Sequence, residues 1–282
     1  MKDLLLIHTG GTIGMAQTDF GLAPKDGLVE GIVNSLLPEG MTLRTHIFAP
    51  LIDSSDVGPH HWNQILDLIE AAPDTAVLIT HGTDTMSFTG AALSQALVGL
   101  HRRVVLCGSM VPLLMEGDAE PNLQLAIATA MCPGEGVFLS FAQRVMHAGG
   151  LVKHDSSMPD SFRPLPQAPL SPPKNRRFDD RRFAILSLSP GLPKVALQAA
   201  LEQLDGAVLR IYGSGTAMSD PGILELLADA TRQGKRLRAV SQCETGGLRP
   251  GTYAAGGGLW KAGVENGGLE TSEAALIQLW LN

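Results

Sequence analysis

Two short apolar runs that each break into a glycine turn constrain the fold of this chain more than any other feature. The aliphatic run Leu4–Ile7 leads into the segment Thr9–Gly14, which reads TGGTIG. Further along, the run Val77–Ile79 leads into His81–Thr85, which reads HGTDT. Continuous apolar runs of this length predict strands buried on both faces. Both turns therefore follow the carboxyl end of a strand, the edge where open α/β sheets bind ligands.

The rest of the chain continues this pattern, because apolar runs alternate with segments of helical periodicity. Such an alternation predicts an α/β fold with a mostly parallel sheet and flanking helices. We expect strands at Asp3–His8, Leu43–Phe48, Ala76–Thr80, Val104–Cys107, Val137–Phe141, Ala184–Leu188, Ala207–Ile211 and Leu237–Ser241. We expect helices at Pro59–Ala72, Ser87–Leu100, Asn122–Met131, Leu192–Leu204, Pro221–Arg232 and Thr271–Leu281.

A proline-rich segment interrupts the alternation. Five prolines and the mixed-charge run Lys174–Arg182 lie between Arg163 and Arg182. Prolines stiffen a linker and exclude regular helix, and interspersed charges are typical of a solvated segment. We therefore predict two domains, 1–165 and 191–282, joined by a linker over 166–190. The first domain is expected to hold a larger, mostly parallel or mixed sheet, and the second a smaller parallel sheet.

Charge and hydropathy exclude several classes of partner. The chain has 282 residues and a formal net charge of −7, with no basic stripe. Nucleic-acid binding needs clustered lysine and arginine, so neither nucleic acid nor an anionic membrane surface is an expected partner. No segment approaches the ~20 apolar residues that cross a bilayer, and the first residues do not resemble a signal peptide. These features predict a cytoplasmic protein.

Metal binding is not expected either. The three cysteines, Cys107, Cys132 and Cys243, are widely spaced and form no C-x-x-C pair, which favours reduced thiols over structural zinc. His60, His61 and His154 lack metal-ligand spacing with a carboxylate partner. We therefore expect no metal and no cofactor.

The residues in the two turns suit nucleophilic attack on a carbonyl group. Thr12 and Thr83 offer hydroxyls, Asp84 offers a carboxylate, and the glycines let backbone N–H groups approach a ligand. A threonine hydroxyl is a poor nucleophile, so it needs a proton acceptor and an oxyanion site. Each turn alone also fits a plain tight turn or a phosphate-binding nest, and Ser54–Ser55 alone fits a helix cap.

Taken together and in this order, TGGTIG and HGTDT resemble the two signature motifs of the bacterial-type L-asparaginases. The two motifs in combination are highly specific. The resemblance covers most of the chain and extends to Asp53–Asp56, Gly108–Leu113, Asp118 with Asn122, and Gly149–Lys153. Near the C-terminus, Gln242–Cys243, Tyr253–Gly256 and Ala262–Val264 resemble the cytoplasmic type I branch.

The resemblance implies an L-asparaginase that acts by covalent catalysis. Thr12 would attack the side-chain amide carbonyl of L-asparagine, ammonia would leave, and water would hydrolyse the aspartyl ester. Thr83, Asp84 and Lys153 would form a second relay of hydroxyl, carboxylate and ammonium. The implied substrate-binding residues, including the oxyanion donors, are Gly11, Ser54, Ser55, Thr83 and Asp84. His81 would orient its loop rather than transfer protons.

One position departs from the family pattern. The family carries a mobile lid after the first motif, with a tyrosine that activates or positions the threonine. Here Leu22 stands at that place and Phe20 lies nearby, and neither side chain can donate a hydrogen bond. The only tyrosines, Tyr212 and Tyr253, are in the second half of the chain. We therefore expect a lid that closes by hydrophobic contact over a site with reduced turnover.

Two other functions remain open at this stage. One is a low-activity or catalytically retired homologue that binds an amino acid as a sensor, which Leu22 favours and the intact relay opposes. The other is the asparaginase-like subunit that supplies ammonia for transamidation of glutamyl-tRNA, but the extra N-terminal region of that subunit is missing. The resemblance further implies a homodimer or homotetramer, and some glutaminase activity is compatible with it.

Overall fold

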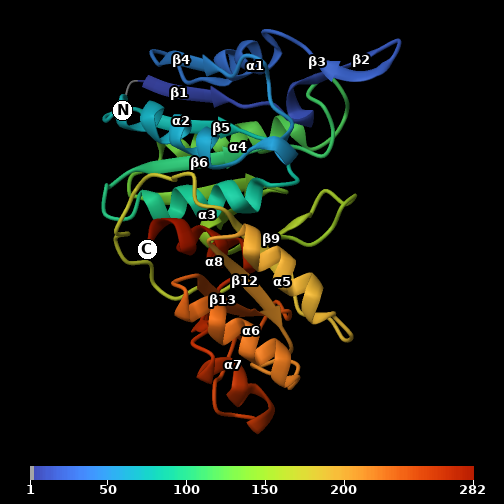
Figure 1. Ribbon diagram of the computed structural model, residues 1–282. Coiled ribbons are helices and arrows are strands. Elements are labelled where there is room, and N and C mark those ends of the chain that lie inside the picture. Colours follow the sequence, from blue (N-terminus) through green and yellow to red (C-terminus); the bar gives the residue numbers. More distant parts are fainter. Residues whose placement is uncertain (1–2) are drawn as a thin grey trace. The chain divides into compact units, whose positions relative to one another are not determined.

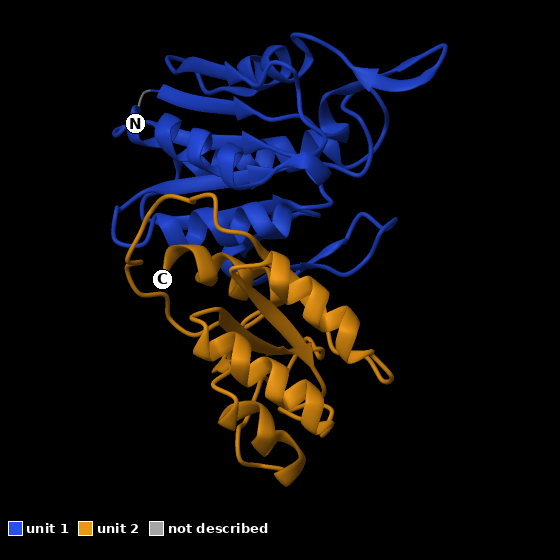
Figure 2. Ribbon diagram, viewed as in Figure 1, with its two compact units in different colours: residues 1–164 blue, residues 165–282 orange. Residues whose placement is uncertain are grey.

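The computed structural model describes residues 3–282 and divides the chain into two compact units, residues 1–164 and 165–282 (Figure 2). Each unit is built around one principal β-sheet with helices packed against it (Figure 1). The expectation of an α/β fold with a larger mixed sheet followed by a smaller parallel sheet is confirmed.

The sheet of the first unit has six strands in the order β4-β1-β5-β6-β7-β8. Their bounds are β1 Asp3–His8, β4 Thr42–Ile47, β5 Ala76–Thr80, β6 Arg103–Cys107, β7 Gly136–Phe141 and β8 Arg144–His147. All neighbours are parallel except β7 and β8. Because β4 and β5 lie on opposite sides of β1, the strand order reverses there, which makes the β1/β5 edge a topological switch point.

Helices cover both faces of this sheet. The helices are α1 Leu28–Leu36, α2 Pro59–Glu70, α3 Met86–Ala96 and α4 Ala119–Met131. One core joins α1 and α4 to alternate strand residues such as Leu6, Leu78 and Val105. The intervening strand residues, such as Ile7 and Ile79, are also fully buried. Burial on both faces explains why these strands are apolar at successive positions.

Short elements complete the first unit. β2 Met15–Thr18 pairs with β3 Gly21–Pro24, and β9 Leu151–Lys153 pairs with β10 Phe162–Pro164, both in antiparallel fashion. Single 3-10 turns lie at Thr12–Gly14, Ser54–Asp56 and Ala148–Gly150. The β2–β3 hairpin occupies the segment that the sequence predicted as a lid.

The second unit holds a four-stranded parallel sheet in the order β11-β12-β13-β14. Its strands are β11 Phe183–Ser187, β12 Gly206–Ile211, β13 Arg236–Ser241 and β14 Glu265–Asn266. Its helices are α5 Lys194–Gln203, α6 Pro221–Arg232, α7 Gly257–Lys261 and α8 Ser272–Leu281, with a 3-10 turn at Ala254–Gly256. Asp220 caps α6 by accepting a hydrogen bond from the backbone N–H of Ile223.

The segment predicted as a linker over 166–190 is part of the second unit. β11 falls within it and pairs with β12, and the backbone N–H of Asn175 bonds to the carbonyl of Leu281. The Phe178 ring packs edge-on against Trp280. Proline excludes helix but permits extended backbone to pack, so a proline-rich segment can pair and pack in this way.

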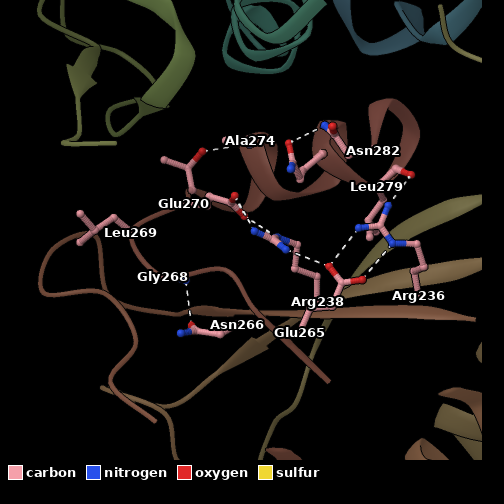
Figure 3. A network of polar contacts seen from close by, with 12 residues as sticks. Arg236, Arg238, Glu265, Asn266, Gly268, Leu269, Glu270, Ala274, Leu279 and Asn282 are labelled. Carbon is pink, nitrogen blue, oxygen red and sulfur yellow. Dashed lines mark hydrogen bonds and ion pairs between the residues drawn. The ribbon is translucent and has the colours of Figure 1, made fainter. Parts of the chain in front are cut away.

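An ion-pair network fastens β14 to β13 in this unit (Figure 3). Arg238 binds both oxygens of Glu270, at 2.6 and 2.7 Å, and donates to Glu265 at 2.8 Å. Arg236 binds the two oxygens of Glu265 at 2.9 and 3.0 Å. Burial opposes ionisation of Glu265, but hydrogen bonds from Arg236 and Arg238 outweigh it, so its pKa lies below the ordinary 4.5.

We expect Arg238→Met to destabilise the protein by about 2 kcal/mol, less than the ~3–5 kcal/mol of a fully buried pair. The side chains of Arg238 and Glu270 are 15% and 21% exposed, so Glu270 would be left partly buried without its partner. Urea unfolding measures the change. Arg232→Met, which removes an exposed pair with Asp229, is the control and should change little.

The same network predicts a pH dependence of stability. The folded-state pKa of Glu265 lies below that of the unfolded chain, so its contribution is complete above pH 4.5 and is lost as pH falls through the folded value. The difference in stability between the parent and Arg238→Met should therefore shrink below pH 4.5. A difference that is constant down to pH 3 would contradict this account.

No helix among residues 3–282 is long and apolar enough to cross a membrane.

Candidate active site

The two glycine turns meet at the switch point between β1 and β5. Gly11 has a φ of 95°, and a Cβ atom added there would lie 2.6 Å from Cα and N of Gly82. A Cβ on Gly82 would lie 2.6 Å from the hydroxyl of Ser54. The backbones of the two turns are thus in direct contact, and the turn at Ser54 packs against them. Only glycine permits this approach, which explains why both turns carry it.

A pocket of about 200 Å³ opens at this edge. Its lining residues come from the first turn, the base of the β2–β3 hairpin, the loop after β4 and the second turn: Gly10, Gly11, Thr12, Met15, Pro24, Leu51, Ile52, Asp53, Ser54, Gly82, Thr83 and Asp84. The volume is below the ~300–1,000 Å³ of pockets for drug-sized ligands, so the pocket suits a molecule the size of an amino acid.

Lys153 joins the second turn from a distant part of the chain. It is the last residue of β9, and its ammonium group donates to the hydroxyl of Thr83 at 2.9 Å and to the carboxylate of Asp84 at 2.6 Å. The Lys153 side chain is 17% exposed, whereas that of Asp84 is 69% exposed. The hydroxyl, carboxylate and ammonium predicted as a relay therefore lie within one hydrogen-bonded group.

Thr12 is placed differently. Its hydroxyl has no hydrogen-bond partner among residues 3–282, although the residue lines the same pocket. The backbone N–H groups of Thr12 and Thr83 likewise find no acceptor within the described part of the chain. The pocket therefore offers a free hydroxyl and free N–H donors, which suits a ligand that carries a carbonyl oxygen.

The structure separates the two serines predicted to bind substrate. Ser54 is buried and lines the pocket. Ser55 does not line the pocket, and its N–H and hydroxyl both bond to Asp53, at 2.9 and 2.8 Å. The N–H bond and then the hydroxyl bond lower the pKa of Asp53, which itself lines the pocket. Asp53 is thus a pocket residue that the sequence did not predict; its position before the serines was the available signal.

The segment predicted as the lid is a regular β-hairpin. Phe20 lies at its tip with a fully exposed side chain. Leu22 pairs with Gln17, is 45% exposed and does not line the pocket, whereas Met15 and Pro24 at the base of the hairpin do. The position of the expected tyrosine is therefore on a projecting strand beside the pocket.

The loop after β6 is held by residues that also belong to the family-like pattern. Asp118 accepts hydrogen bonds from the backbone N–H groups of Met110 and Val111. Asn122 donates to the carbonyl of Gly108 at 3.0 Å and accepts from the N–H of Ala142. These two residues support the loop and do not line the pocket.

The cysteines and potential metal ligands lie apart from this chemistry. Burial raises the pKa of the Cys107 thiol far above its usual range, so it is no nucleophile. Within residues 3–282, no group of three or more His, Cys, Asp or Glu residues is placed to hold a metal ion.

Fold and site together define an α/β protein that presents two threonine hydroxyls, carboxylates and an ammonium group at the switch point of its larger sheet. Comparison with known protein families identifies the class of protein to which this fold and site belong. A model described as "Asparaginase, N-terminal" matches residues 3–179, and one described as "Glutaminase/Asparaginase C-terminal domain" matches residues 182–282. The chain belongs to the asparaginase family.

Individual relatives extend over the whole chain. L-asparaginase 1 of Escherichia coli K12 is 30% identical over 306 residues, covering 99% of this chain and 90% of that protein. The crystal structure of L-asparaginase I from Vibrio cholerae matches with a TM-score of 0.86 at 30% identity, covering 99% of this chain and 92% of that one. The 60 kDa lysophospholipase of Mus musculus is also 30% identical, over 330 residues, covering 99% of this chain and 58% of that protein.

The protein is therefore an asparaginase-family hydrolase. Two relatives with different stated activities are equally identical to this chain, so sequence identity does not define the substrate.

Proposed function

We propose that this protein is an L-asparaginase that hydrolyses L-asparagine to L-aspartate and ammonia through a threonine-linked acyl-enzyme. The observation that carries the proposal is the hydrogen-bonded group of Lys153, Thr83 and Asp84 beside the unpartnered hydroxyl of Thr12. A lysophospholipid is a poorer fit, because a pocket of about 200 Å³ has little room for an acyl chain.

In the proposed reaction, the hydroxyl oxygen of Thr12 forms a bond to the amide carbon of the substrate. The oxyanion that develops accepts hydrogen bonds from the N–H groups of Gly11 and Thr83. The carbon–nitrogen bond then breaks, and nitrogen leaves as ammonia with the proton of the Thr12 hydroxyl. Water attacks the resulting ester, which releases L-aspartate and restores the threonine.

The remaining pocket groups would hold the substrate and move protons. Asp84 and Asp53 carry the negative charge that the α-ammonium group of asparagine requires, and Ser54 can donate to the α-carboxylate. Lys153 holds the Thr83 hydroxyl, so that Thr83 can pass a proton when ammonia leaves and when water attacks.

Ammonia release by the purified protein tests the proposal. L-asparagine should be hydrolysed faster than L-glutamine by about 10- to 200-fold in kcat/KM, the discrimination available from one methylene group. Exhaustive chelation should leave the rate unchanged. Faster turnover of glutamine, or a rate that falls with chelator and returns with metal, would contradict it.

A second candidate is a low-activity homologue that senses an amino acid, and the leucine at position 22 favours it. Calorimetric binding of asparagine without measurable release of ammonia would establish the sensor and overturn the enzyme.

The lid provides a sharper prediction within the enzyme proposal. If the β2–β3 hairpin closes over the pocket as a lid, Leu22→Tyr should raise kcat on the order of tenfold, because a phenol there can orient the Thr12 hydroxyl or relay its proton in the transition state. The gain should stay below the 10²- to 10⁴-fold rate increase of a fully positioned acid–base group, because no neighbouring residue is placed to orient the new hydroxyl. Leu22→Phe, which adds the ring without the hydroxyl, is the control.

Steady-state kinetics of the three proteins decide this point. An unchanged kcat in Leu22→Tyr, or an equal gain in Leu22→Phe, would mean that the Thr12 hydroxyl needs no phenol or that another group already orients it.

We further propose a cytoplasmic location and a homodimer or homotetramer. The free thiols of Cys107, Cys132 and Cys243 are compatible with a reducing compartment. Light scattering on the purified protein would determine the assembly.

A further inference from the structure

A chain of three buried side chains lies behind the second turn and is not used in the reaction described above. The indole N–H of Trp62, on α2, donates to the hydroxyl of Thr89, on α3, at 3.0 Å. The Thr89 oxygen lies 2.9 Å from Nε2 of His81, and Nδ1 of His81 lies 2.6 Å from the carbonyl oxygen of Gly82. The exposed fractions of Trp62, Thr89 and His81 are 3%, 0% and 1%.

Chemistry fixes the donor and the acceptor in each of these three hydrogen bonds. A carbonyl oxygen can only accept, so Nδ1 of His81 must carry the proton. Burial lowers the pKa of His81 to about 4, so the ring is neutral near pH 7 and Nε2 is a bare acceptor. Thr89 must therefore donate to Nε2. Its oxygen accepts in turn from the indole N–H of Trp62, which can only donate.

The planarity of the peptide bond links the hydrogen bond at the Gly82 carbonyl to the direction of the Thr83 N–H. The carbonyl of Gly82 and the N–H of Thr83 belong to one planar trans peptide, so the two groups point in opposite directions. His81 draws the carbonyl toward the buried interior. The N–H of Thr83 is thereby directed away from His81, and it has no acceptor among residues 3–282. Thr83 itself lines the pocket.

The preceding peptide, between His81 and Gly82, lies where the two turns approach each other most closely. Gly11 packs against the backbone of Gly82 so closely that an added Cβ would lie 2.6 Å from two of its atoms. Gly11 therefore holds N and Cα of Gly82 in place, while the hydrogen bond from His81 fixes the carbonyl that follows and with it the direction of the Thr83 N–H. Accepting a strong hydrogen bond at the carbonyl also polarises the peptide, which makes its N–H a better donor.

We propose that His81, supported by Thr89 and Trp62, is a positioning residue that aims and polarises the backbone N–H of Thr83 as an oxyanion donor. The inference rests on the proposed amide hydrolysis. It gives His81 a specific task through Nδ1, which is distinct from proton transfer and from simple filling of the core.

Two substitutions at the same position separate this task from a structural role. The side-chain amide of His81→Asn can place an N–H where Nδ1 stands and donate to the Gly82 carbonyl. The amide of His81→Gln lies one atom further out, nearer the place of Nε2, and cannot. We expect kcat for asparagine to fall on the order of 100-fold in His81→Gln, the scale for losing one oxyanion donor. In His81→Asn it should fall by less than about fivefold, with KM within about threefold of the parent in both.

A second pair of variants tests whether the hydrogen bond from Thr89 holds the His81 ring in place. Thr89→Val removes the donor to Nε2 and should lower kcat by roughly tenfold, since it loosens the ring without removing the Nδ1 proton. Thr129→Val is the matched control, because Thr129 is also a buried helical threonine but donates to the carbonyl of Leu125. The control should retain the parental kcat. Melting temperatures of all four variants identify any that fail to fold.

The hydrogen-bond direction has a readout that does not depend on activity. Nitrogen NMR of histidine-labelled protein at pH 7.5, with His81 assigned by the loss of its signals in His81→Asn, should show a protonated Nδ1 and a bare Nε2. A proton on Nε2 would overturn the proposal. So would equal kcat values in His81→Asn and His81→Gln, or an effect confined to KM. If the parent turns over neither amide, the proposed function and the positioning task fail together, whereas the tautomer is still decided by NMR.

Discussion

Replacing Thr12 with alanine is expected to abolish turnover while the fold and the binding of substrate persist. The Thr12 hydroxyl lines the pocket and has no partner among residues 3–282, so its removal breaks no hydrogen bond of the folded protein. Loss of a covalent nucleophile should reduce kcat by well over 100-fold. Ammonia release measures the rate, and calorimetry with L-aspartate measures the binding that should remain.

Thr42→Ala, at the exposed start of β4, is the control for a threonine outside the pocket and should be as active as the parent. If Thr12→Ala retains more than about a hundredth of the parental rate, Thr12 is not the nucleophile. Thr83, whose hydroxyl is bonded to Lys153, would then become the candidate.

Lys153→Met is expected to lower kcat by about 10²- to 10⁴-fold, the usual scale for losing acid–base assistance. The substitution removes the ammonium group from Thr83 and Asp84 but preserves much of the volume of the side chain. The melting temperature should change little, because the Asp84 side chain is 69% exposed and water can replace the lost partner.

Lys261→Met, at an exposed position in α7, controls for the loss of a positive charge. Kinetics and thermal unfolding of both variants separate the possible roles. A large drop in melting temperature with a nearly unchanged kcat would make Lys153 a structural residue and remove the relay from the mechanism.

Sequence alone was sufficient for eight of the ten strands in the two principal sheets, all except β8 and β14. The strands β1, β5, β6 and β7 are buried on both faces, so nearly every position in them is apolar and the sequence alone predicts them. The helix α6 was also predictable, because Asp220 and the following proline form a local start signal that needs no tertiary contact.

Other elements carried no such signal. The helix α1 begins after Gly27, which has no side chain to cap it, and it contains Gly31, so its start lacks a local signal although its apolar residues recur at helical spacing. The strands β9 and β14 have only three and two residues, too few for a period to be visible. These elements exist because the surrounding structure gives their backbone groups partners, which no local pattern records.

The same division holds for the candidate active site. Thr12, Thr83, Asp84 and Gly11 could be located from the sequence because each follows a strand that local hydrophobicity defines, and parallel strands end at a common edge. The contact of Lys153 with Thr83 spans 70 positions, and the local turn in which Ser55 bonds twice to Asp53 leaves Asp53 rather than Ser55 lining the pocket. The task of His81 depends on Thr89 and Trp62, which lie on two different helices. Short-range patterns decide which residues end a strand. Only packing decides which side chains then share a hydrogen bond, because distances below 3 Å are set by the whole fold rather than by neighbours in the chain.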